Sequence, residues 1–183
     1  MTGPLWCQHR LVFCLPETGK AVSGLREDML QEGICNMAEN NRGPGLTAAH
    51  GEWAGWSVSH GDPFNDHVGP FHYRKDGDGT LVCAMEVEAK HLNGGGGLHG
   101  GALATFADFC LFAFAGLTGN AAAVTVSLHC DYVGGAGLGD RIECRGHVTR
   151  ETGSMIFLGG TITHGSAPVM AFSGILKKLR SRP

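Results

Sequence analysis

The sequence has no run of about eighteen apolar residues and no pair of cysteines in a Cys-x-x-Cys spacing. The first absence excludes a membrane-spanning helix. The second, with an odd total of seven cysteines, argues against a disulfide framework or a zinc ribbon. A basic start and a small-residue cleavage pattern are also missing, so no signal peptide is expected. We therefore expect a protein of the reducing cytoplasm, without a membrane partner.

Charged residues are few, and neither sign dominates. They make up 17% of the chain, with 14 Lys and Arg against 17 Asp and Glu for a net charge of −3. The basic residues are scattered apart from a short tail at residues 177–182, so no nucleic-acid partner is expected. Hydrophobic residues at 43% of 183 are enough for a core, and the length fits one domain with an appendage.

The N-terminal part shows no sustained hydrophobic period until Ser23, where an amphipathic helix is predicted to run to Asn41. A cluster of helix-breaking residues, Arg42 to Gly45, follows it. We therefore divide the chain into an appendage of residues 1–45 with one helix and a main domain of residues 46–183.

The main domain combines one apolar helix with several alternating strands. The helix is predicted over Gly101–Leu117, a run with a single charge at Asp108. Alternation of apolar and polar residues predicts six strands, at Phe71–Arg74, Leu81–Lys90, Val124–Val133, Asp140–Arg150, Met155–His164 and Val169–Leu179. Hairpin-length links make the last four antiparallel, so the fold class is α+β, with a long helix packed on an antiparallel sheet.

Two stripes of this helix differ in character. Leu103, Phe106, Cys110, Phe114 and Leu117 form a bulky stripe suited to packing on the sheet. A second stripe is mostly small, and consists of Gly101, Ala104, Thr105, Asp108 and Phe112. A carboxylate in an apolar setting is costly unless it is bonded or paired, so Asp108 is either a functional group or the partner of a buried amide.

Glycine is over-represented, at 30 residues, and six glycines fall between Asn93 and Gly101 just before the helix. Free amides at a helix start stabilise negative charge, as phosphate sites and oxyanion holes both do. Gly95, Gly97 and Gly100 match Gly-x-Gly-x-x-Gly, but the acidic residue expected about 20 positions on is absent, so dinucleotide binding is rejected. The Gly-Lys-Ser/Thr motif of a phosphate-binding P-loop is absent as well. An oxyanion hole is therefore the function that remains for these amides.

The residues around this loop therefore suggest a carbonyl-directed site. The amide of Gly100 or Gly101 would polarise the carbonyl, and Asp108 would act as base or nucleophile. Asn93, with a donor and an acceptor, would hold water or the carbonyl. No Ser or Cys lies in the loop as an acyl-enzyme nucleophile, and His91 and His99 lack the further ligands of a metal site.

The pattern His91-x-Asn93-x5-His99-Gly100-Gly101-x6-Asp108 resembles the hotdog-fold acyl-CoA thioesterases of the phenylacetate-pathway type. The likeness covers roughly Trp53 to Leu179. It implies a hot-dog fold, in which a central helix is wrapped by a curved antiparallel sheet of five to six strands. It also implies homodimers, often paired into tetramers, with active sites at the dimer interface that take residues from both subunits.

The resemblance assigns roles to nine residues. It makes Asp108 the catalytic carboxylate, Gly100 the amide donor, Asn93 the group that positions water or thioester, and Thr125 a hydroxyl that assists. Alternation along Val124–Val133 predicts that Thr125 and Ser127 lie on the same face of their strand, away from the core. It places His91, His99, Gly101, Phe112 and Ser127 against the substrate. The implied reaction hydrolyses an acyl- or aryl-acyl-CoA thioester, with coenzyme A as part of the substrate and with no metal or other cofactor. Four consecutive glycines in the loop depart from the family pattern.

Two other functions fit the same residues. A hotdog hydratase or dehydratase would use His99 with Asp108, and would add water to an enoyl-CoA without releasing thiol. A non-catalytic acyl-CoA-binding module would bind its ligand without turnover.

Overall fold

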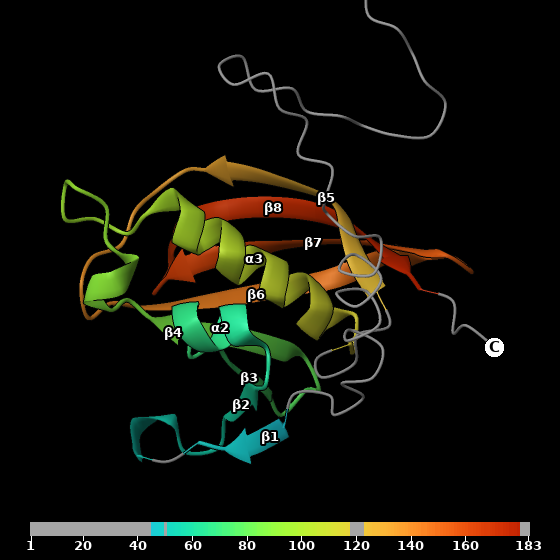
Figure 1. The fold of residues 1–183 in the computed structure, drawn as a ribbon, viewed down its shortest axis with the longest axis horizontal. Helices are drawn as coiled ribbons and strands as arrows, with labels where there is room; N and C mark the ends of the chain where they lie inside the picture. The colour runs from blue at the N-terminus through green and yellow to red at the C-terminus, as the bar shows by residue number, and fades with distance from the viewer. Residues whose placement is uncertain (1–44, 50, 118–122, 180–183) are drawn as a thin grey trace, which may run out of the picture. The chain divides into compact units, whose positions relative to one another are not determined.

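The computed structural model describes residues 45–49, 51–117 and 123–179, which lie in the unit that spans Arg42–Pro183 (Figure 1). The predicted helix at 23–41 lies outside the described residues, and so does nearly all of the predicted appendage. The strands are β1 (Gly45–Ala48), β2 (Ser57–His60), β3 (His72–Lys75), β4 (Leu81–Glu86), β5 (Ala123–Tyr132), β6 (Arg141–Glu151), β7 (Met155–His164) and β8 (Ala167–Lys178). The helices are η1 (Gly51–Trp53), α2 (Pro63–Val68), η2 (Ala89–His91) and α3 (Gly100–Phe114).

All eight strands form one antiparallel sheet in the order β1-β2-β3-β4-β6-β7-β8-β5, and α3 lies across one face of it (Figure 1). This is the α+β hot-dog architecture expected from the sequence. The sheet has two strands more than the upper expected number of six, namely β1 and β2. Each of them has only four residues, too few for a clear alternating pattern.

Helix α3 buries the bulky stripe that the sequence predicts. Leu103, Phe106 and Cys110 are buried against the sheet, and Phe114 packs against the same core at the end of the helix. Hydrophobic burial of this face fixes which way the helix is turned. The small stripe that carries Asp108 therefore lies outside this buried face, and Asp108 itself is turned toward β5 at the edge of the sheet.

Glycines within the strands make room for this helix. A Cβ on Gly146 of β6 would lie 2.4 Å from the ring of Phe114, and a Cβ on Gly174 of β8 would lie 2.4 Å from Leu111. A side chain at either position would force Phe114 or Leu111 of α3 to move, because packed interiors do not leave space for an added methyl group. Part of the glycine excess thus serves close packing of α3 on the sheet.

Strand β4 is buried on both faces, although its pattern predicts a half-exposed strand. Cys83 belongs to the core under α3, whereas Val82 and Ala84 belong to a separate cluster with Trp56. Trp56 is only 3% exposed and belongs to the segment between η1 and β2. The extra strands therefore bring in a tryptophan that covers a surface the sequence pattern leaves open.

A β-bulge in β5 changes the direction of its side chains. Thr125 pairs with Leu176, and Ser127 pairs with Ile175, so Val126 is the inserted residue. Leu176 is fully buried under α3 and Ile175 is only partly buried, and cross-strand partners share a face. The prediction that Thr125 points away from the core, on the same face as Ser127, is therefore wrong: Thr125 faces α3 and Ser127 faces the other way.

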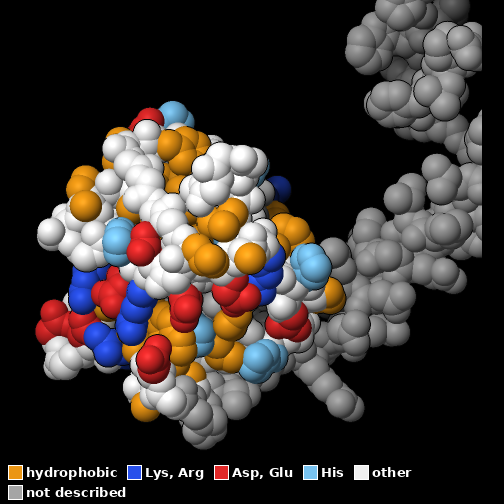
Figure 2. Space-filling model, turned by 90° about the vertical axis from the view of Figure 1, so that its left-hand side faces the viewer, with side chains coloured by type: hydrophobic (Ala, Val, Ile, Leu, Met, Phe, Trp, Pro, Cys, Tyr) orange, Lys and Arg blue, Asp and Glu red, His pale blue; other side chains and the backbone are white. Residues whose placement is uncertain are grey.

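Charged side chains of both signs are interspersed on the face shown in Figure 2. Arg145 pairs with Asp76 at 2.7 Å, and Arg141 pairs with Glu143 at 3.0 Å. Within the described residues, no helix is long and apolar enough to cross a membrane.

Candidate active site

The start of α3 offers one free amide. His99 caps the helix, and its Nδ1 accepts a hydrogen bond from the amide of Gly101 at 2.8 Å. The carbonyl of His99 accepts from the amides of Ala102 and Leu103. Within the described part of the chain, the Gly100 amide has no acceptor. Of the two glycines considered from the sequence, Gly100 is therefore the one whose amide is available to a substrate oxygen.

The glycine-rich loop before α3 is closed by Asn93. The Asn93 Oδ1 atom accepts from the amides of Gly95 at 2.8 Å and Gly97 at 3.3 Å, and the main chains of Asn93 and Gly97 also bond. Gly96 has a positive φ of 81°, which a residue with a Cβ rarely adopts. Because its oxygen is engaged, the Asn93 side chain has only its Nδ2 donor left to offer to a ligand.

Asp108 and Thr125 form the second half of the site. The Thr125 hydroxyl donates to Oδ1 of Asp108 at 2.6 Å, from β5 to the middle of α3. Burial raises the pKa of Asp108, the Thr125 hydrogen bond lowers it, and the charge of Asp62 raises it further, with a net upward direction. A carboxyl group with a raised pKa is a stronger base than an ordinary surface aspartate.

Within one chain these two halves lie apart. Gly100 and Asp108 are eight positions apart on one helix, which corresponds to about 12 Å at 1.5 Å per residue. An oxyanion donor has to approach the reacting oxygen to about 3 Å. One carbonyl group therefore cannot contact the amide of Gly100 and the carboxylate of Asp108 of the same helix.

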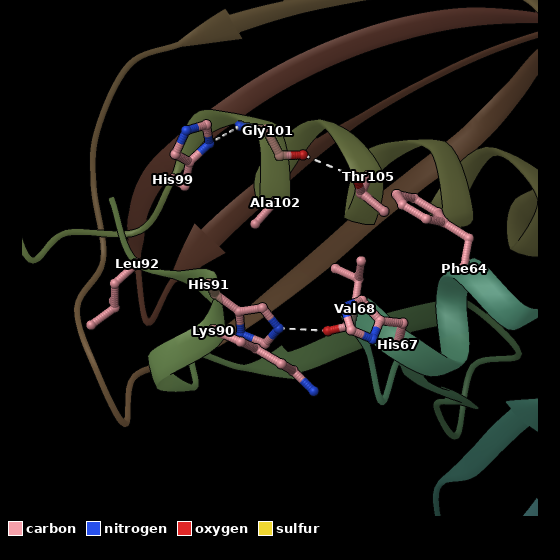
Figure 3. Close-up of a pocket in the computed structure, with 10 residues that line it drawn as sticks. All are labelled: Phe64, His67, Val68, Lys90, His91, Leu92, His99, Gly101, Ala102 and Thr105. Carbon is pink, nitrogen blue, oxygen red and sulfur yellow. Dashed lines mark hydrogen bonds between the residues drawn. The ribbon is translucent and has the colours of Figure 1, made fainter. Parts of the chain in front are cut away.

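The two histidines of the predicted site have different surroundings. His91 is only 2% exposed, and its Nδ1 accepts from the amide of Glu88 while its Nε2 donates to the carbonyl of Val68 (Figure 3). Its ring therefore has no free nitrogen for a substrate. His99 is exposed, and its Nε2 has no hydrogen-bond partner among the described residues.

A cavity of about 310 Å³ lies between α2 and the first turns of α3 (Figure 3). Phe64, His67 and Val68 of α2 line one side, and Gly101, Ala102 and Thr105 of α3 line the other. His91 and His99 also line it, so three of the five predicted substrate contacts are brought together here. Phe112 lies further along α3 and packs against the core, and Ser127 is on the outer face of β5.

The sequence-based prediction missed the residues of α2 and also Tyr132. Asp62 caps α2 by accepting from two amides of its first turn, and Pro63 follows as the first helical residue. An Asp-Pro pair of this kind is a recognised signal for a helix start. Tyr132 donates its hydroxyl to the carbonyl of Gly100 at 3.2 Å, a contact that no local pattern in the sequence indicates. Three or more His, Cys, Asp or Glu side chains arranged to hold a metal ion are not found in the described ranges.

Comparisons with known proteins show the family and the fold. A family model described as the thioesterase superfamily matches residues 95–171. "Putative esterase PA0474" of Pseudomonas aeruginosa is 36% identical over 115 residues, which cover 62% of this chain and 86% of that protein. Human acyl-coenzyme A thioesterase 13 is 32% identical over 87 residues, or 47% of this chain and 62% of that protein. A variant of the phenylacetic acid degradation protein PaaI from Thermus thermophilus superposes with a TM-score of 0.55 at 31% identity, covering 64% of this chain and 100% of that one.

Proposed function

The chain belongs to the thioesterase superfamily, and on that premise we propose that it hydrolyses an acyl- or aryl-acyl-CoA thioester to the free acid and coenzyme A. The observation that carries the proposal is the presence on one helix of both a free amide, at Gly100, and a carboxylate of raised pKa, at Asp108. The similarity to acyl-coenzyme A thioesterase 13 supports the choice of coenzyme A as the thiol.

The reaction needs a water molecule, a base and an oxyanion donor. Asp108 takes a proton from water, the water oxygen bonds to the thioester carbonyl carbon, and the carbonyl oxygen becomes negative. The Gly100 amide donates to that oxygen, and the positive end of the α3 dipole adds to the stabilisation. The C–S bond then breaks, and the thiolate receives the proton. This sequence calls for no cofactor beyond the coenzyme A of the substrate.

A second route has the Asp108 carboxylate attack the carbonyl carbon itself and expel the thiolate, after which water opens the resulting anhydride at the Asp108 carbonyl carbon. The two routes differ in where the oxygen of water goes, because only the second places it in the Asp108 side chain over repeated turnover. Mass spectrometry of the protein after reaction in ¹⁸O-labelled water distinguishes them. We favour water activation, since the raised pKa of Asp108 strengthens it as a base.

The separation of Gly100 and Asp108 supports a homodimer in which each site uses both chains. In two antiparallel α3 helices related by a two-fold axis near Ala104, Gly100 of one chain lies opposite Asp108 of its partner. Gly101, Ala104 and Thr105 are small and allow two helices to approach closely. The tetramer that the sequence resemblance implies stays a prediction.

Strand β5 provides the edge for this dimer. It is the last strand of the sheet and has ten residues, so its outer backbone groups pair with no other strand among the described residues. Val124, Val126 and Tyr132 on this strand are 44%, 54% and 52% exposed. A long apolar edge of this kind is best explained by pairing with a second copy of the chain.

The four cysteines within the described residues are free, which fits the predicted reducing compartment. Cys83 and Cys144 lie directly opposite each other on β4 and β6, and both are free thiols, as are Cys110 and Cys130. We include a cytoplasmic location in the proposal on this ground.

The proposal is tested by measuring thiol release from short, medium, long and aryl acyl-CoA substrates, with an enoyl-CoA included. We expect release of coenzyme A and of the matching free acid for at least one class. Addition of water to the enoyl-CoA without thiol release would indicate the hydratase function instead. Binding of acyl-CoA without any turnover would indicate a binding module.

A further inference from the structure

Strand β5 contacts α3 at two points, and only one of them is explained by the proposed carboxylate chemistry. Thr125 bonds to Asp108 near the middle of the helix. Tyr132 reaches the start of the helix, where its hydroxyl donates to the Gly100 carbonyl at 3.2 Å. The same strand thus touches both residues to which the proposed reaction assigns a chemical role.

The tyrosine ring also packs directly on Gly100. A Cβ on Gly100 would lie 3.3 Å from Cε1 and 3.6 Å from Cζ of Tyr132, so the ring occupies the space beside the glycine Cα. A contact of 3.3 Å is tighter than a normal carbon–carbon contact, and a side chain at residue 100 would push the ring away. Gly100 and Tyr132 therefore fit each other as a pair.

We propose that Tyr132 is a positioning residue that holds the Gly100 amide in the direction required for an oxyanion donor, an inference that rests on the proposed function. His99 holds the first turn from the other side, because its Nδ1 takes the Gly101 amide. The Gly100 amide shares its peptide unit with the His99 carbonyl, which accepts from the amides of Ala102 and Leu103. The next peptide unit, made of the Gly100 carbonyl and the Gly101 amide, is held by Tyr132 and by the Nδ1 of His99. The peptide units on both sides of the Gly100 Cα are therefore held, and this fixes the direction of the free amide. Preorganised donors of this kind stabilise developing charge without reorganising during the reaction.

Surrounding groups keep the tyrosine hydroxyl as a donor. Desolvation raises the pKa of Tyr132, and the neighbouring Cys130 raises it further, so the hydroxyl is protonated at neutral pH. The direction of the hydrogen bond to the Gly100 carbonyl is therefore fixed, because a carbonyl oxygen only accepts.

The test compares Tyr132→Phe with Tyr73→Phe. Both remove one phenolic oxygen and keep the ring, and these are the only two tyrosines of the chain. Tyr73 lies on β3, which is separated from β5 in the sheet by β4, β6, β7 and β8. For Tyr132→Phe we expect kcat for thioester hydrolysis to fall roughly three- to tenfold with KM changed less than about twofold, because the amide acts on charge that exists only in the transition state. Tyr73→Phe is expected to keep kcat within about twofold.

A second readout does not depend on turnover. The amide of Ala104 bonds to the carbonyl of Gly100 in an α-helix, so its hydrogen exchange reports on the first turn. We expect Tyr132→Phe to speed exchange at Ala104 several-fold while leaving Leu111, further along the same helix, unchanged.

Unchanged exchange at Ala104 in Tyr132→Phe would overturn the inference, and so would an unchanged kcat in an active enzyme. A rise in KM with kcat retained would also overturn it, since that pattern indicates a role in ground-state binding. If the parent protein hydrolyses no thioester, the proposed function fails on its own, and the exchange measurement still decides whether Tyr132 orders the helix start.

Discussion

Thr125 and Asp108 come from different elements, β5 and α3, and the Thr125 hydroxyl donates to Oδ1 of Asp108 at 2.6 Å. The bond stabilises the ionised carboxylate and so opposes the burial that raises its pKa. Thr125→Val should therefore raise the pKa of Asp108 further. Because the ionised form is the base, activity should begin to fall at a higher pH as the solution is made acidic.

The measurement is the dependence of kcat on pH for the wild type, Thr125→Val and Thr125→Ser. The serine variant keeps a hydroxyl and should retain the wild-type acid limb. An acid limb in Thr125→Val that coincides with that of the wild type would show that the hydrogen bond does not set the pKa of the catalytic base.

The Asn93 side chain has two roles that variants can separate, because its Oδ1 closes the glycine-rich loop and its Nδ2 is a donor for a ligand. Asn93→Asp keeps an oxygen that can accept from the amides of Gly95 and Gly97, but it loses the Nδ2 donor and adds a negative charge. We expect Asn93→Asp to keep its thermal stability and lose kcat by about tenfold or more, since a carboxylate repels a developing oxyanion. Asn93→Ala should lose both loop stability and activity. Full activity in Asn93→Asp would limit Asn93 to closing the loop.

The dimer edge is tested at the bulge of β5. Val126 is 54% exposed, and Val126→Lys places a charge on an edge strand, which natural proteins use to prevent strand pairing. We expect a folded monomer by light scattering, with kcat/KM reduced by about tenfold or more because neither site is complete. Val148→Lys on β6, where the parent valine is 37% exposed, is the control and should remain dimeric. A fully active Val126→Lys monomer would show that one chain contains the whole site.

Acid should destabilise the fold through His72. Burial first, and then the charge of Arg141, lower its pKa from 6.5 to about 4, and its ring stacks on Trp53 at 3.8 Å. Between these two pH values the unfolded chain binds a proton that the folded chain does not. The stabilisation is therefore complete above pH 6.5 and is lost as the pH falls toward 4.

Denaturant unfolding at about pH 7 and about pH 4.5 measures this effect. We expect the wild type to lose roughly 1–3 kcal/mol more than His72→Phe over this range. His147→Gln, at an exposed position on β6, serves as the control and should behave as the wild type. Equal losses in the wild type and His72→Phe would remove His72 from the acid response.

The sequence predicts the parts of this fold that have a regular period. The stripe Leu103, Phe106 and Cys110 is buried as expected, because a helix that packs on a sheet repeats its apolar residues every three or four positions. Strand β7 spans Met155–His164, as its alternation indicates. Strands β1 and β2 are too short for a period. Trp56, which precedes β2, packs against Val82 and Ala84 of β4, and this contact between residues distant in sequence is not visible in a local pattern.

The site is predictable to a similar degree. Asp108 is a lone charge in an apolar helix and is visible in the sequence. The glycines before that helix limit the amide donor to Gly100 or Gly101, and the structure selects Gly100 because His99 takes the Gly101 amide. The face of Thr125 is not, because one inserted residue at Val126 reverses the alternation of β5. The Tyr132 contact with Gly100 depends on how β5 crosses α3, and only the three-dimensional arrangement reveals it.

The central claim is that Asp108 drives thioester hydrolysis, and the most direct test is kcat of Asp108→Asn on the best substrate of the acyl-CoA panel. The amide keeps the shape of the carboxylate and can still bond to Thr125, so we expect an unchanged melting temperature and a similar KM. Loss of the base should lower kcat by about 10²–10⁴-fold. A kcat within a few-fold of the wild type would contradict the account and remove Asp108 from the reaction.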